Sequence, residues 1–62
     1  MKPKKLMQIL EEEGWFIARS DGSHFIFKHP EKPGMPVVPV HNKDMKPGTL
    51  HQIIKIAGLK LK

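Results

Sequence analysis

The sequence contains no cysteine, no long apolar run and few acidic residues. Without cysteine, neither a disulfide framework nor a thiolate zinc site can supplement the hydrophobic core. The longest uninterrupted apolar run, Trp15–Ala18, is far too short to span a bilayer, and nothing resembles a secretory signal. These absences predict a cytoplasmic protein with no membrane partner.

The shortage of acidic residues leaves a strong positive charge. Six Asp and Glu stand against eleven Lys and Arg, so the formal net charge is +5 and the pI is about 9.8. On so small a surface this excess produces a positive field that attracts polyanions. Nucleic acid is the partner that this charge favours, an acidic protein is close behind, and the two are compatible.

The length predicts one domain over residues 1–62, with a thin core, because a chain of this size buries only about 60% of its unfolded surface. Lys2–Glu13 is predicted to be a helix. Pro3 suits its first turn and Gly14 offers a stop. Its apolar residues recur at helical spacing: Leu6, Ile9 and Leu10.

A second helix is predicted near the end of the chain. Thr49 and Gln52 fit the capping-box pattern, which makes Thr49 the expected N-cap, and Gly58 is the expected end. Residues 59–62 are predicted to be a frayed basic tail. One face of this helix is apolar through Leu50, Ile53, Ile54 and Ala57.

Three strands are predicted between the helices, over Trp15–Arg19, His24–His29 and Val37–His41. Asp21-Gly22 in the first connection favours a tight antiparallel hairpin. Pro36 and Pro39 lack an amide donor, which places the third strand at a sheet edge or beside a bulge.

The order α-β-β-β-α predicts an α+β two-layer sandwich, in which both helices cover one face of an antiparallel three-stranded sheet. In the middle strand Phe25 and Phe27 share one side, and His24, Ile26 and Lys28 share the other. The sequence leaves open which set faces the helices, and a bulge near the turn would place His24 with either set. In both cases the open face carries apolar groups beside cations, as binding surfaces do.

His24 is the candidate catalytic residue, because it follows the Asp21-Gly22 turn on a strand that has cations and no carboxylate. If His29 pairs with Pro36, His24 lies opposite His41, with Cβ atoms about 4.5–5.5 Å apart. Two such histidines can act as general base and general acid in the cleavage of a phosphodiester. One takes the proton of the 2′-hydroxyl, and the other protonates the leaving 5′-oxygen. Three cations are candidates to stabilise the transferring phosphate: Arg19, Lys28 and Lys43.

Other interpretations of the histidines remain open. His24 by itself could form a hydrogen bond with the backbone of the turn. His29 is most simply a residue at the end of a strand, and His51 a residue on the surface of the second helix. A metal site built on His24 and His41 would have too few ligands, so neither a metal nor a cofactor is predicted. No nucleophile elbow, P-loop or H-E-x-x-H motif is present. Ser23 should point away from His24, which makes it a poor nucleophile.

Several motifs, taken in order, resemble the HicA (YcfA-like) toxin family over nearly the whole chain: Gly22-Ser23-His24, Lys28-His29-Pro30, Val38-Pro39-Val40-His41, Lys46-Pro47-Gly48-Thr49-Leu50 and Ala57-Gly58-Leu59. The resemblance implies a fold like the double-stranded-RNA-binding domain. It also implies the toxin of a type II toxin–antitoxin system, a ribonuclease acting on mRNA. A HicB-like antitoxin would neutralise it by covering the active-site histidine.

Carried over by position, the family's catalytic histidine falls on His24 and its supporting loop on Gly22 and Ser23. Many relatives have a second histidine where this chain has Phe25, a ring that still offers a flat stacking surface. A role for His41 follows from strand register alone. The expected RNA-binding residues are Arg19, Ser23, Phe25, Phe27, Lys28 and Lys43. The alternative function is a non-catalytic RNA-binding module of the same fold.

Overall fold

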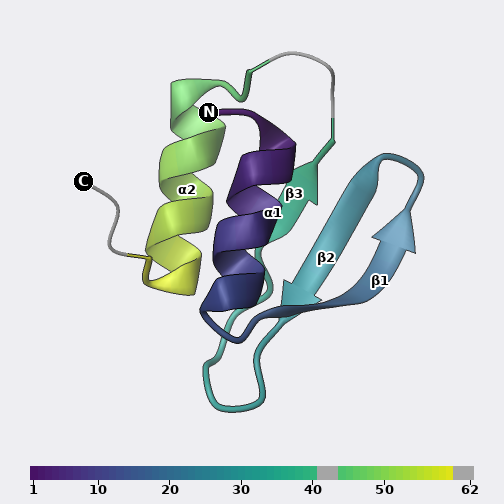
Figure 1. The fold of residues 1–62 in the computed structure, drawn as a ribbon, viewed down its shortest axis with the longest axis vertical. Coiled ribbons are helices and arrows are strands. Elements are labelled where there is room, and N and C mark those ends of the chain that lie inside the picture. Colours follow the sequence, from purple (N-terminus) through teal and green to yellow (C-terminus); the bar gives the residue numbers. More distant parts are fainter. Residues whose placement is uncertain (41–43, 60–62) are drawn as a thin grey trace.

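The computed structural model describes residues 1–40 and 44–59. Its elements (Figure 1) are α1 (Pro3–Glu12), β1 (Phe16–Asp21), β2 (His24–Lys28), β3 (Val37–Pro39) and α2 (Pro47–Ala57). The α-β-β-β-α order and the α+β class predicted from the sequence are confirmed, with an antiparallel sheet of order β1-β2-β3. The fold is of the double-stranded-RNA-binding-domain type.

The β1–β2 hairpin extends beyond the cover of the helices. Figure 1 shows α1 and α2 side by side over the part of the sheet that contains β3, with the hairpin projecting to one side. All six residues of β1 are accordingly exposed. The prediction that β3 lies at a sheet edge is confirmed, and β2 is the central strand.

The core settles which face of β2 meets the helices. Phe27 is completely buried and Phe25 packs against the core, while His24 and Lys28 are exposed. Since side chains alternate along a strand, His24, Ile26 and Lys28 lie on the face that no helix covers. The buried hydrophobic residues come from both helices, two strands and the connections: Leu6, Leu10, Trp15, Phe27, Val38, Met45, Ile53, Ala57 and Leu59.

The ends of α2 differ from the prediction. The helix begins at Pro47 with Lys46 as its N-cap, so the prediction of Thr49 as N-cap was wrong. Proline at the first helical position already has the helical φ, which favours the earlier start. At the other end Gly58 has φ 67° and the Leu59 N–H donates to the Ile54 carbonyl at 3.0 Å, a Schellman pattern. Leu59 is therefore buried rather than frayed, and residues 60–62 lie outside the described part.

The register between β2 and β3 also differs from the prediction. His24 pairs with Pro39, and the Phe27 N–H donates to the Pro36 carbonyl at 2.9 Å. The predicted pairing of His29 with Pro36 was therefore wrong, and with it the inference that His41 is the cross-strand partner of His24. The Phe27–Pro36 hydrogen bond sets the observed register, and His29 is not available for pairing because β2 ends at Lys28 and the His29 ring bonds to neighbouring segments.

His29 connects the loop after β2 to the end of α1. Its Nε2–H donates to the Glu13 carbonyl at 3.1 Å, and its Nδ1 accepts the N–H groups of Glu31 and Lys32 at 3.0 and 3.2 Å. The ring also meets Trp15 edge-on, with centroids 5.2 Å apart. His29 was predicted to be a strand-end residue, whereas in the structure it joins the loop after β2 to the end of α1.

Substituting His29 tests that role. His29→Asn keeps an acceptor for the following backbone N–H groups but loses the bond to Glu13 and the contact with Trp15, which should lower the free energy of unfolding by about 1–2 kcal/mol. His29→Ala removes the acceptor as well and should cost about 2–3 kcal/mol. Urea unfolding followed by the fluorescence of Trp15, the only tryptophan, measures both. Equal stability of the two variants and the parent would contradict the structural role.

Candidate active site

His24 has a fixed backbone and an exposed side chain. It is the first residue of β2 and follows the two-residue loop Gly22-Ser23, where Gly22 has φ 62°. Glycine adopts this left-handed conformation at no steric cost, as a tight hairpin loop requires. The Val40 N–H donates to the Ser23 carbonyl at 2.7 Å and ties the loop to the segment after β3. The imidazole is thereby presented to solvent from a well-anchored position.

The open face of the sheet is defined by the strand pairings. Arg19 lies opposite Ile26 because the register of β1 shifts between Ile17 and Arg19. Residues that pair directly share a face. The open face therefore consists of Phe16, Arg19 and Asp21 from β1, His24, Ile26 and Lys28 from β2, and Val37 and Pro39 from β3. Apolar side chains stand beside cations on it, as the sequence predicted.

Arg19 is the described cation closest in register to His24. Diagonal cross-strand neighbours lie about 7–8 Å apart, within reach of an arginine side chain. Lys28 shares the face but lies four residues along β2, about 13 Å away at 3.3 Å per residue. Ser23 is exposed in the loop. The other two predicted residues, His41 and Lys43, lie outside the described part of the chain.

Asp21 belongs to the site although it was not among the predicted site residues. It pairs directly with His24 across the hairpin, so a carboxylate and the imidazole are cross-strand neighbours on the open face. The prediction took account of carboxylates on the strand of His24 alone. The short Gly22-Ser23 loop was the signal that would have revealed the pairing, since it brings the residues on its two sides together.

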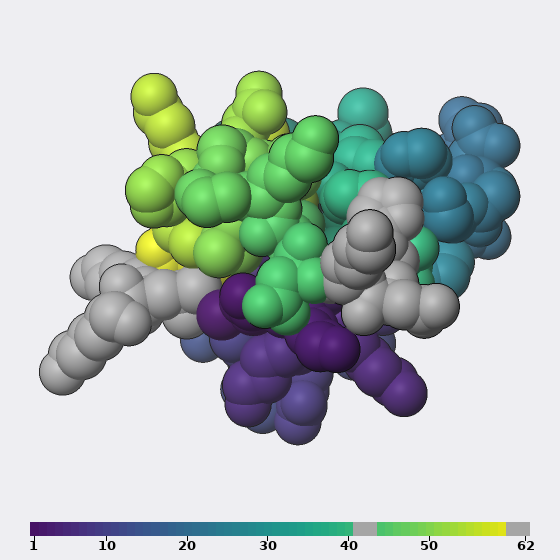
Figure 2. Space-filling view, turned by 90° about the horizontal axis from the view of Figure 1, so that it is seen from above, coloured from purple at the N-terminus to yellow at the C-terminus, as the bar shows by residue number. Residues whose placement is uncertain are grey.

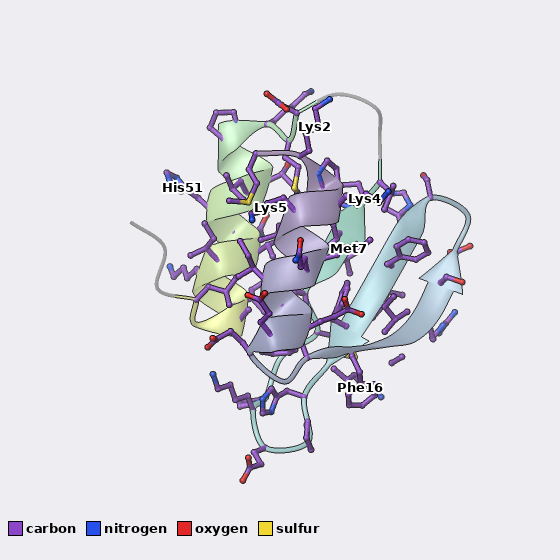
Figure 3. The ribbon with its side chains drawn as sticks, in the orientation of Figure 1. Lys2, Lys4, Lys5, Met7, Phe16 and His51 are labelled. Carbon is purple, nitrogen blue, oxygen red and sulfur yellow. The ribbon has the colours of Figure 1, made fainter. Side chains whose placement is uncertain are left out.

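The aromatic residues are arranged differently from the prediction. Phe27 is completely buried, so its ring has no surface for a base and its predicted RNA-binding role was wrong. Phe25 is half-buried on the side that faces the helices, opposite to His24. Phe16 is 49% exposed on the open face, and Figure 3 shows it projecting from the hairpin away from the helices. Phe16 is the ring that this face offers for stacking.

Within residues 1–40 and 44–59, no three His, Cys, Asp or Glu side chains are grouped so that they could hold a metal ion. Neither helix of the described part has the length and hydrophobicity to cross a membrane.

The fold and this face define a small basic α+β domain that presents a histidine on an uncovered sheet face, with Asp21 opposite it and Arg19 at the diagonal cross-strand position. A family model described as the HicA toxin of bacterial toxin-antitoxin matches residues 3–59. The chain therefore belongs to the HicA toxin family and is the toxin of a toxin–antitoxin system, which implies a HicB-type antitoxin as its partner. No curated protein matches the chain.

Proposed function

We propose that this toxin is a ribonuclease that cleaves mRNA with His24 as its catalytic base. The observation that supports this most is the position of His24, exposed at the start of a central strand, on the face that no helix covers. Arg19 stands on the same face at diagonal cross-strand distance, where it can meet the charge of a phosphate.

In the proposed reaction His24 takes the proton from a 2′-hydroxyl, and the 2′-oxygen forms a bond to the adjacent phosphorus. The bond from phosphorus to the 5′-oxygen breaks, and the 5′-oxygen receives a proton from water or from the imidazolium. Arg19 stabilises the added charge on the phosphate oxygens. The products are a 2′,3′-cyclic phosphate and a 5′-hydroxyl, and DNA is not cut because it lacks the internal nucleophile.

Single-stranded RNA is the proposed substrate. In-line attack requires a flexible backbone, and unstacked bases can stack on an exposed aromatic ring. Phe16 provides such a ring on the face of His24. Stacking on Phe16 would hold a base at the far end of the hairpin, because Phe16 pairs with Lys28 while His24 begins the strand.

We further propose that the HicB-type antitoxin neutralises the toxin by covering the open face. Exposed Phe16 and Val37 supply apolar area, and the net charge of +5 favours an acidic partner. A partner seated there excludes RNA from His24 by occupying the same surface.

The ends of the products test the proposed chemistry. Purified toxin and end-labelled single-stranded RNA are incubated in excess EDTA, with the matching DNA strand as control. We expect cleavage of RNA alone, with a 2′,3′-cyclic phosphate (or its opened form) and a 5′-hydroxyl. Products with a 5′-phosphate and a 3′-hydroxyl, or dependence on added metal, would contradict the mechanism. Binding without any cleavage would indicate an RNA-binding module instead.

A further inference from the structure

Asp21 is an acidic side chain on a face that the proposed function assigns to a phosphate backbone. Among the described residues that form this face, the cations are Arg19 and Lys28, and Asp21 is the only carboxylate. A carboxylate repels phosphates, so Asp21 opposes RNA binding rather than contributing to it. The residue directly opposite Asp21 is His24, which points to a role in the chemistry instead of in binding.

The conformation of the hairpin turn does not depend on Asp21. Gly22 has φ 62° and Ser23 has a negative φ, the combination of a type II′ turn, in which the first central position is the one that demands glycine. Aspartate commonly stabilises a turn by accepting a backbone N–H within it. Within residues 1–40 and 44–59, the Asp21 carboxylate accepts no such hydrogen bond. Local structure therefore accounts for Gly22 but not for Asp21.

Asp21 and His24 are close enough to bond without any movement of the backbone. They are the first pair of the hairpin, and direct cross-strand neighbours have Cβ atoms about 4.5–5.5 Å apart on the same face. Rotation of the two side chains is sufficient to bring the carboxylate to the imidazole. The loop between them is held in place, because the Val40 N–H donates to the Ser23 carbonyl at 2.7 Å.

The pair lies at an exposed end of the molecule. Figure 2 looks onto the end where the hairpin turns, and the hairpin (blue) stands at one edge, away from α1 and α2. Both side chains are exposed, and neither has a hydrogen-bond or ion-pair partner among the described residues. An ion pair between exposed side chains contributes little to stability. Hydrogen bonds between catalytic groups tighten when substrate binds, so a bound strand is what would make this pair effective.

We propose that Asp21 is a positioning residue for His24 in the cleavage of RNA. This inference rests on the proposed function and adds the group that orients its base. With RNA bound, the Asp21 carboxylate accepts the N–H of one ring nitrogen, so that the other nitrogen presents its lone pair to the 2′-hydroxyl. Once that second nitrogen has taken the proton, the carboxylate stabilises the imidazolium, and Asp21 itself takes no proton.

Arg19 is the competing partner for this carboxylate. It lies two residues before Asp21 on the same face, about 7 Å along the strand, whereas the Cβ atoms of Asp21 and His24 are about 5 Å apart. In the proposed reaction the phosphate engages Arg19, which leaves Asp21 to His24. If Asp21 served only to offset the charge of Arg19, its loss would strengthen RNA binding without slowing cleavage.

Two substitutions of Asp21 and one control test the role. Asp21→Asn keeps the shape of the side chain but introduces an amide NH2 group, which favours the wrong tautomer of the histidine. Asp21→Glu keeps the charge on a longer stem. Glu12→Gln removes the same charge from an exposed position at the end of α1, in the helix layer. Single-turnover cleavage of labelled RNA in EDTA gives the rate at saturating protein and the affinity, and thermal melting gives the stability.

We expect Asp21→Asn to lower the rate at saturating protein by about 10–100-fold, as does removal of other groups that orient a functional histidine. RNA affinity should stay the same or rise, because a negative charge beside the phosphates is lost. Asp21→Glu should restore most of the rate, and Glu12→Gln should cut as fast as the parent. All three variants should melt with the parent, since both positions are exposed.

Three results would overturn the proposal. The first is an unchanged rate in Asp21→Asn, whether or not RNA binds more tightly. The second is a loss of rate together with a lower melting temperature, which would indicate a structural role. The third is an equal loss in Glu12→Gln, which would attribute the effect to net charge.

Nitrogen NMR of the His24 ring separates this proposal from the nuclease proposal. The ring signals, assigned by their absence in His24→Ala, are recorded with saturating oligothymidylate at alkaline pH, where a histidine ring is neutral. This strand cannot react, because it lacks the 2′-hydroxyl. We expect one tautomer in the parent and a mixture in Asp21→Asn, and identical spectra would overturn the proposed contact. If the parent fails to cut RNA but the tautomers differ in this way, the reaction is refuted and the Asp21–His24 pair remains.

Discussion

Substituting His24 with alanine should reduce RNA cleavage by about 10²–10⁴-fold and leave RNA affinity within about twofold. The loss is expected because His24 is the exposed imidazole of the open face and, in the proposed mechanism, the group that takes the 2′-hydroxyl proton. Stability should change little, since the side chain is exposed. Single-turnover cleavage of labelled RNA in EDTA, with anisotropy for binding, measures both quantities.

His51→Ala is the matched control for that experiment. His51 is likewise an exposed histidine, but it lies on α2 and projects outward in Figure 3, away from the sheet. Its loss should leave cleavage unchanged. Equal cleavage by the parent, His24→Ala and His51→Ala would refute the role of His24, and His41→Ala would then be the next variant to measure.

Substituting Phe27 with alanine should remove most of the stability of the protein. Phe27 is completely buried among residues of both helices and β3, and truncation of a buried phenylalanine costs about 3–5 kcal/mol. A chain of 62 residues has only about 3–9 kcal/mol of stability at 0.05–0.15 kcal/mol per residue. Far-UV circular dichroism and urea titration followed by Trp15 fluorescence should show a largely unfolded population or a strongly lowered midpoint.

Phe16→Ala provides the contrast with Phe27. Phe16 is 49% exposed on the open face, so its truncation should cost less than about 1 kcal/mol of stability. Loss of a stacked base should weaken RNA binding by about 1–3 kcal/mol. A Phe27→Ala protein as stable as the parent would contradict the assignment of the faces of β2, as would a Phe16→Ala protein that unfolds.

Local pattern was sufficient to predict the fold and to make His24 the candidate catalytic residue, a role that stays a prediction. Helical spacing in Leu6, Ile9 and Leu10 predicted α1, Asp21-Gly22 predicted the hairpin, and the prolines of β3 predicted an edge strand. Each of these signals acts within a few residues, because it depends on backbone conformation or on the period of one element. The mixture of apolar groups and cations on the open face could also be foreseen, since both alternating sets of β2 contain apolar residues.

Contacts between distant segments were not encoded in those local patterns. The burial of Phe27 rather than Ile26 depends on which side of the sheet the helices pack. The predicted β2–β3 register was two residues off because it paired His29 with Pro36, whereas His29 lies outside the strand and bonds to Glu13, Glu31 and Lys32. The periodicity of a strand does not reveal the hydrogen-bond partners of a side chain such as His29, because those partners lie in other segments of the chain.

By itself, the sequence determined the order of the elements, the positive charge and the position of a histidine directly after a tight turn, because propensity and spacing act locally. Tertiary structure alone decided that Phe16 is an exposed ring on the open face, that Asp21 and Pro39 lie opposite His24, and that Met45, just before α2, is hydrogen-bonded to Met1, just before α1. These features join residues far apart in the chain, so they depend on packing between elements and on register across the sheet.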